Sequence, residues 1–371
     1  MEDALGVFAV LCFLAAFVTS ILLTFVAKRM AVKFGLLAHP TDDRFHKKII
    51  PMGGGISIFL TILLACLTVT VFIEFFMFNQ TTELFGRNFE LYIQGFAAKT
   101  IQLWIAIGCA AVLFLLGMWD DMKNLGPVPK LVVEFAVAFA AAYWGDVRVE
   151  FFIESRLLTS ILSTFWIVLI INAFNFLDNM DGTSAGIAII VSLIMFIIAI
   201  LSKQAFVACF AMVFSGTLAG FLVFNFYPAS IFMGDAGSLV VGFFVALLTL
   251  KTTYYNSMED IRWYNIIMPL VIMAIPLYDF ISVTALRIRQ GKSPFVGDTQ
   301  HFSHRLKRLG LTEVQAVLTL YLATIATGLG AVVLKETEWP YGVLVFLQTI
   351  MVLGIIAVLE SMGKNGNKQT N

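Results

Sequence analysis

The chain has 371 residues, of which 60% are hydrophobic and only 13% are charged, and its mean hydropathy is +0.91. Because a soluble domain carries about 25% charged residues, this composition excludes a soluble protein and predicts an integral membrane protein. The 24 basic and 24 acidic side chains balance, so the net charge gives no indication of a nucleic-acid partner.

Apolar runs recur along the whole chain, and one membrane crossing needs about 20 such residues. Eleven runs qualify or nearly qualify: 5–27, 53–76, 100–119, 130–145, 158–177, 184–201, 205–226, 236–250, 263–286, 312–334 and 340–360. The fourth and eighth runs are short, so we expect their flanks to extend them or neighbouring helices to shelter them. This pattern predicts an all-α, polytopic protein with about 11 transmembrane helices, with residues 1–362 in one membrane-embedded domain and 363–371 as a flexible tail.

Basic residues are distributed unequally between the two sides that these spans define. Sixteen lysines and arginines fall in the loops after the first, third and ninth spans and at the C-terminus, and eight fall on the other side. The positive-inside rule then predicts an outside N-terminus and a cytoplasmic C-terminus. The loops after the odd-numbered spans are cytoplasmic in this prediction, and they hold the polar motifs.

The first of these loops holds His46 within a basic stretch and ends in three glycines, Gly53 to Gly55, at the start of the next span. Consecutive backbone N–H groups at a helix start can form a nest that binds an anion. Alone, this signal is weak, because glycine is common in membrane helices.

Two adjacent carboxylates, Asp120 and Asp121, follow the third span. They repel each other and the negative end of the helix dipole, which indicates that a cation or proton offsets them. The alternative is a solvated turn, where aspartate is common.

Polar residues recur at every third position from the end of the fifth span, at Asn172, Asn175, Asp178 and Asp181. If helix continues here, they share one face. The stripe begins inside an apolar span, where unpaired polar groups are costly, and its oxygens are ligands that Mg²⁺ prefers. The alternative is a purely structural stripe.

The loop after the seventh span starts at Asn225 and contains Pro228, which ends the helix. Gly234 allows a close approach of the backbone, and Asp235 and Ser238 lie where the next helix begins. The alternative to metal binding is that Asp235 caps this helix, and capping does not exclude metal binding.

The loop after the ninth span contains Asp298, His301, His304 and Arg305. The two histidines share a helical face and are candidates for binding phosphate or metal. A zinc site is disfavoured, because no third cysteine or histidine lies nearby. The basic residues are either a solvated surface or ligands for phosphate.

Carboxylates, amides and bases on one side of the membrane fit Mg²⁺-assisted transfer of a phosphorylated group from a soluble donor to a lipid. In order, the motifs resemble the signature of the polyprenyl-phosphate N-acetylhexosamine-1-phosphate transferase superfamily, glycosyltransferase family 4: Gly117-x-x-Asp-Asp121, Asn175-x-x-Asp-x-x-Asp-Gly182, Phe232-Met-Gly-Asp-x-Gly-Ser238 and the His301–His304 loop. Arg44-x-His46 and Ser293-Pro294-Phe295 resemble the undecaprenyl-phosphate N-acetylglucosamine-1-phosphate branch. The phospho-N-acetylmuramoyl-pentapeptide branch typically has a run of three histidines instead.

The resemblance implies a role for each motif residue. Asp235 would be the principal ligand of Mg²⁺, or of Mn²⁺ in its place, and Asn175 the second ligand. Asp120, Asp121 and Asp178 would be catalytic. The substrate-binding residues would be Asp181, Asn225, His301, His304, Arg305, His46, Gly53 and Gly54.

The implied reaction transfers N-acetylglucosamine 1-phosphate from UDP-N-acetylglucosamine to undecaprenyl phosphate at the cytoplasmic membrane face and releases UMP. It is the first membrane step of a cell-envelope polysaccharide pathway. The implied partners are a UDP-N-acetylhexosamine, the polyprenyl lipid, membrane lipids and a second copy of the chain in a homodimer.

Other functions remain as alternatives. The phospho-N-acetylmuramoyl-pentapeptide, or another UDP-N-acetylhexosamine, is a different donor for the same chemistry. A transporter would instead place ionisable groups at mid-membrane, often in repeated halves. Glu134 and Asp279 are the main acids within spans, and the sequence shows no repeat.

Overall fold

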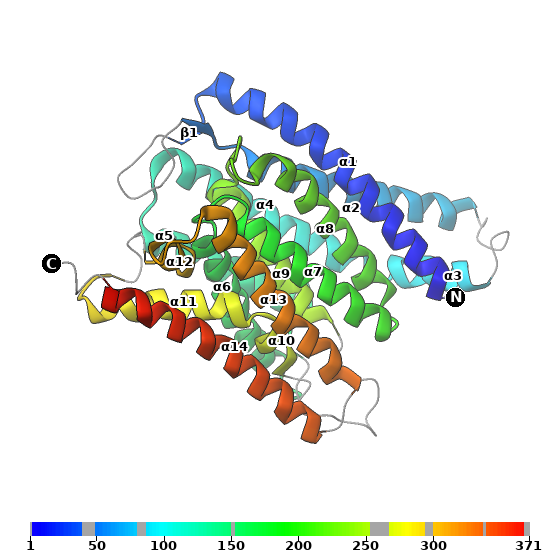
Figure 1. The fold of residues 1–371 in the computed structure, drawn as a ribbon. Coiled ribbons are helices and arrows are strands. Elements are labelled where there is room, and N and C mark those ends of the chain that lie inside the picture. Colours follow the sequence, from blue (N-terminus) through cyan, green and yellow to red (C-terminus); the bar gives the residue numbers. More distant parts are fainter. Residues whose placement is uncertain are drawn as a thin grey trace.

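The computed structural model of the chain describes residues 2–38, 49–79, 87–149, 153–252, 267–293, 300–336 and 339–366. In these ranges the protein is a bundle of long helices (Figure 1). Nine of the helices described are long and apolar enough to cross a membrane: α1 (Glu2–Phe34), α2 (Gly54–Asn79), α4 (Thr100–Lys123), α6 (Arg156–Leu177), α7 (Thr183–Leu201), α8 (Ala205–Asn225), α9 (Gly234–Lys251), α13 (Glu313–Glu336) and α14 (Trp339–Gly366). The predicted all-α, polytopic membrane fold is confirmed.

The other two predicted spans also coincide with helices. The run 130–145 coincides with α5 (Pro127–Tyr143), and the described part of the run 263–286 coincides with α10 (Met268–Ile272) and α11 (Ala274–Arg289). Helix α14 extends to Gly366, into the segment expected to be a tail.

Short elements join the long helices. They are α3 (Arg87–Ala97), α12 (Phe302–Arg308) and an antiparallel pair of two-residue strands, β1 (Leu37–Ala38) and β2 (Ile50–Pro51). An isolated bridge also pairs Met52 with Phe232, so the chain entering α2 lies beside the chain entering α9.

Helix α9 forms the centre of the bundle. It packs against α6, α4, α2 and α7, and its side chains from Ala236 to Thr249 are buried. This surrounding protein explains how a run that is short for a lipid-facing span is accommodated. Helix α1 begins and α14 ends at opposite ends of the bundle (Figure 1).

Candidate active site at the helix ends

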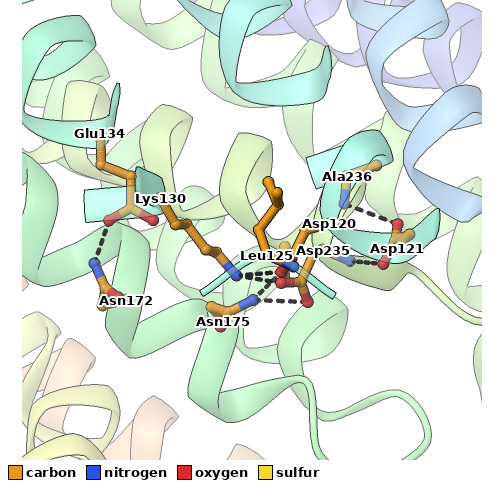
Figure 2. Close-up of polar contacts among 10 residues, drawn as sticks. Asp120, Asp121, Leu125, Lys130, Glu134, Asn172, Asn175, Asp235 and Ala236 are labelled. Carbon is orange, nitrogen blue, oxygen red and sulfur yellow. Dashed lines mark hydrogen bonds and ion pairs between the residues drawn. The ribbon is translucent and has the colours of Figure 1, made fainter. Parts of the chain in front are cut away.

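The end of α4 meets the beginning of α9 through Asp121. The N–H groups of Asp235 and Ala236 donate to the two carboxylate oxygens of Asp121, at 2.8 and 3.2 Å (Figure 2). The first N–H groups of a helix lack partners within the helix and lie at the positive end of its dipole. Asp121 therefore caps α9, and these backbone donors offset part of the charge repulsion that the sequence predicted.

Glycines allow this close contact. A β-carbon at Gly117 would lie 2.4 Å from the backbone of Ala236, and one at Gly55 would lie 2.5 Å from the nitrogen of Gly237. Gly234 has φ +68° and its missing β-carbon would lie 2.6 Å from Asp121 Oδ2. Larger residues at these positions would push α2, α4 and α9 apart.

Lys130, on the first turn of α5, lies between the carboxylates of Asp120 and Asp235. Its ammonium group donates to Asp120 Oδ2 at 3.0 Å and also to Asp235 Oδ2 (Figure 2). The other oxygen of Asp120 accepts from Leu125 N–H at 2.6 Å. Asn175 Nδ2 donates to Asp235 Oδ1 at 3.1 Å and to Ser238 Oγ at 2.9 Å. Four predicted residues, Asp120, Asp121, Asn175 and Asp235, thus form one cluster, with Lys130 as an addition that the sequence motifs did not assign.

A second polar contact joins α5 and α6 one helical turn away from Lys130 and Asn175. Asn172 Nδ2 donates to Glu134 Oε2 at 2.5 Å (Figure 2). It also donates to Val168 O at 2.9 Å. Glu134 is fully buried, and its other oxygen has no hydrogen-bond partner within the described ranges. Since Glu134 follows Lys130 by one helical turn, the contact holds α5 against α6 at the position from which Lys130 reaches the carboxylates.

The loop after α6 is tied to the loop after α8. Asp181 Oδ2 accepts from Ala229 N–H at 2.8 Å. Burial raises the pKa of the Asp181 carboxyl, and the hydrogen bond from Ala229 partly offsets this rise. Asn225, predicted to bind substrate, is buried and uses both ends of its amide: Oδ1 accepts from Gly182 N–H at 3.1 Å and Nδ2 donates to Ile231 O at 3.0 Å. Asp178 is the half-buried residue that ends α6.

The glycines at the start of α2 use their N–H groups within the protein. Gly53 and Gly54 donate to Phe232 O at 3.4 and 2.9 Å, and Gly55 donates to Met233 O at 3.0 Å. These contacts fix α2 against the loop before α9, and the geometry adds no support for an anion nest. His46 and Asp298 lie outside the described residues.

Asp279 on α11 holds the start of α12. Its Oδ2 accepts from His301 Nδ1 at 3.0 Å, and its Oδ1 accepts from Phe302 N–H at 2.6 Å. Ser303 Oγ donates to Asn179 Oδ1 at 2.6 Å, which joins α12 to the loop after α6. Asp279, which the sequence offered as a possible transport-type group, therefore holds the segment from His301 to Arg305 in place.

The remaining predicted residues of this segment face neighbouring helices. His304 is buried, and burial together with nearby His301 lowers its pKa to about 4. Arg305 Nη2 donates to Ser282 Oγ at 2.6 Å and lies 3.1 Å from Glu360 Oε1. The His301 ring packs edge-on against Phe176, with the ring centroids 5.7 Å apart, so this segment adjoins the residue that follows Asn175.

The oxygen atoms of the cluster fit Mg²⁺. Within the described ranges no three histidines, cysteines, aspartates or glutamates converge as a complete protein cage. Mg²⁺ is usually held by one or two carboxylates together with water and substrate phosphates, and Asp235 and Asp120 already share one cationic group, Lys130. Asn175 directs its amide nitrogen at Asp235, an arrangement that orients this carboxylate.

Known proteins are similar to this chain over most of its length. The profile of glycosyl transferase family 4 matches residues 103–253. "Undecaprenyl-phosphate alpha-N-acetylglucosaminyl 1-phosphate transferase" of Yersinia pestis is 30% identical over 83% of this chain and 79% of its own length. "Probable undecaprenyl-phosphate N-acetylglucosaminyl 1-phosphate transferase" of Bacillus subtilis (strain 168) is 28% identical over 98% and 95%. "Decaprenyl-phosphate N-acetylglucosaminephosphotransferase" of Mycolicibacterium smegmatis (strain ATCC 700084 / mc(2)155) is 25% identical over 89% and 81%.

These names match the branch that the motifs predicted. The matched region runs from the first turn of α4 to just past the end of α9, and it contains every residue of the carboxylate cluster. The chain therefore belongs to glycosyl transferase family 4.

Proposed function

We propose that the protein transfers N-acetylglucosamine 1-phosphate from UDP-N-acetylglucosamine to undecaprenyl phosphate and releases UMP. The observation that carries this proposal is the cluster of Asp120, Lys130, Asn175 and Asp235 at the helix ends. The relatives, whose names describe the same transfer to a polyprenyl phosphate, support it.

The reaction needs charge control more than proton transfer. An oxygen of the lipid phosphate attacks the sugar-linked phosphorus of the donor, and the bond from that phosphorus to the oxygen of UMP breaks. A phosphomonoester has a second pKa of about 6, so the acceptor is largely a dianion at neutral pH. A general base would therefore accelerate the attack little, and we assign Asp120 and Asp178 to positioning groups around the transferred phosphate.

Mg²⁺ held by Asp235, with the amide oxygen of Asn175 as its second ligand, would neutralise the diphosphate of the donor. Lys130 supplies a further positive charge at the same carboxylate. His301 and Arg305, on the segment that adjoins the end of α6, are the proposed contacts to the donor. The excess of basic residues on this side of the chain supports a cytoplasmic active site in the cytoplasmic membrane. The single domain of residues 1–362 and the homodimer stay predictions.

A donor screen tests the proposal. Purified protein in nanodiscs is given Mg²⁺, undecaprenyl phosphate and one of three donors: UDP-N-acetylglucosamine, UDP-N-acetylgalactosamine or UDP-N-acetylmuramoyl-pentapeptide. With UDP-N-acetylglucosamine, we expect UMP release that requires the lipid. We also expect a lipid product with the mass of the diphosphate-linked sugar. Release with the pentapeptide donor alone would contradict the assignment to this branch.

The same assay separates two mechanisms. With a donor labelled at the sugar-linked phosphorus and no lipid, direct attack predicts unlabelled protein. A covalent aspartyl phosphate isolated under these conditions would contradict direct attack while leaving the overall reaction in place.

A further inference from the structure

A cavity of about 420 Å³ lies at the end of the bundle away from the carboxylate cluster. It is lined by the ends of α3 and α9, the beginnings of α4 and α8 and the segment after α5. Helix α9 separates the two sites, because Asp235 is on its first turn and Lys251 ends it, about 24 Å away at 1.5 Å per residue. In Figure 1, α3 lies beside the start of α1, whereas β1 and α12 lie at the other end.

The inner wall of this cavity is apolar and aromatic. Phe96 of α3 packs edge-on against Phe206 of α8, with the ring centroids 5.4 Å apart, and Phe210 packs against Phe244 at 5.4 Å. The volume is within the range of ligand pockets, about 300–1,000 Å³, and it suits a segment of a hydrocarbon chain.

The rim of the cavity is positively charged. Three lysines, Lys99, Lys203 and Lys251, and one aspartate, Asp146, are the charged residues that line it. Asp146 is already compensated, since Arg148 Nε donates to its carboxylate at 2.8 Å and Lys251 Nζ lies 3.8 Å from it. Within the described part of the chain, the ammonium groups of Lys99 and Lys203 form no hydrogen bond or ion pair, and only the backbone groups of these two residues are bonded.

We propose that this cavity binds one anionic phospholipid, with an acyl chain against the aromatic wall and the phosphate at Lys99 and Lys203. The two features support each other, because an apolar wall alone would accept any lipid and surface lysines alone would attract any anion. The site is separate from the proposed reaction, and its test requires no turnover.

Native mass spectrometry measures this binding. The purified full-length protein is delipidated in a non-ionic detergent and titrated with phosphatidylglycerol or with phosphatidylcholine of the same acyl chains. We expect one phosphatidylglycerol per chain to bind more tightly than phosphatidylcholine. Equal binding of the two lipids would overturn the proposal.

Two kinds of variant separate the head group from the chain. Lys99→Gln with Lys203→Gln should weaken phosphatidylglycerol by about fivefold for each lysine and leave phosphatidylcholine unchanged. Val207→Phe, which adds a ring at the apolar wall, should weaken both lipids. The control, Lys28→Gln with Lys33→Gln near the end of α1, should bind as wild type does.

Other outcomes contradict the proposal. Unchanged phosphatidylglycerol binding in the double lysine variant would show that the two lysines do not bind the head group. Unchanged binding in Val207→Phe would show that the apolar wall does not bind the acyl chain. If inorganic phosphate displaces the lipid at equal concentration, the acyl chain contributes nothing to the binding affinity. If the double variant is not monodisperse, Lys203→Gln alone gives the same reading at about fivefold.

Discussion

Lys130 places one ammonium group between two carboxylates that come from different helices, Asp120 of α4 and Asp235 of α9. The sequence motifs select the carboxylates, because their spacing and their position after apolar runs are unusual. They do not select Lys130, which stands apart from them in an ordinary basic position. Only the fold shows that α5 directs this side chain back to the end of α4.

Removing this ammonium group should make stability depend on the metal. Lys130→Gln leaves two half-buried carboxylates without their cation, which costs about 1–3 kcal/mol, between the values for exposed and buried ion pairs. Added Mg²⁺ should restore part of that loss by binding to the same oxygens. Thermal unfolding in EDTA and in Mg²⁺ measures both states, and we expect a larger deficit in EDTA. An equal deficit in the two buffers, or an equal deficit in the exposed-lysine control Lys123→Gln, would contradict this role.

The hydrogen bond between Glu134 and Asn172 should act through Lys130. Glu134→Ala and Asn172→Ala each remove the contact between α5 and α6, and we expect each to lower kcat by about tenfold with little change in KM. The double variant should lose no more than either single one. Glu134→Gln keeps an oxygen for Asn172 Nδ2 and should restore most of the rate. Additive losses, or no rescue by glutamine, would show that Glu134 has a different role.

Buried His304 predicts a loss of stability in acid. Its pKa is about 4 in the folded protein against 6.5 normally, so below pH 6.5 the unfolded chain binds a proton that the folded chain does not. Its contribution is complete above pH 6.5 and is lost as the pH falls toward 4, by about 3 kcal/mol in all. Thermal unfolding between pH 7 and 4 should therefore fall less steeply for His304→Gln. An equal dependence of the melting temperature on pH in wild type and His304→Gln would contradict the claim that burial lowers the pKa of His304.

Contacts between helices determine how closely the site residues approach one another. The eleven apolar runs coincide with helices because hydrophobicity over a span's length is a strong signal. Helix α3 was missed because its apolar residues occupy one face rather than a continuous run. Asp279 and Glu134 resembled transport groups because a sequence shows that an acid lies within a span but not which partner it meets. Their partners, His301 and Asn172, lie on other helices.

Gly117 provides a test of the packing of α4 against α9. Gly117→Ala places a methyl group 2.4 Å from the backbone of Ala236 and should cost about 1–3 kcal/mol. It should also lower activity, because Asp120 and Asp121 follow on the next turn. Gly108→Ala is the matched control on the same helix, since a β-carbon there meets nothing within 4 Å. Similar melting temperatures and rates for the two variants would show that the close approach does not matter.

The whole molecule has one end with the carboxylate cluster, where we propose the active site, and an opposite end with a lysine-rimmed cavity. The one-sided arrangement of acids could be predicted from the order of spans and motifs alone. The connections among them could not, since Asn225 joins two loops and Asp121 caps a helix whose start lies more than a hundred residues later. The alternative prediction that Asp235 caps the next helix is corrected in its residue, because the carboxylate that caps α9 is that of Asp121.

Asp235, the proposed metal ligand, provides the decisive experiment. UMP release from UDP-N-acetylglucosamine, with undecaprenyl phosphate and Mg²⁺, is measured for Asp235→Asn and for the exposed control Glu154→Gln, after both are shown to be monodisperse in nanodiscs. We expect Asp235→Asn to lose activity by a factor of about 10³ and Glu154→Gln to match wild type. Wild-type release by Asp235→Asn would contradict a catalytic site at the junction of α4, α5 and α9.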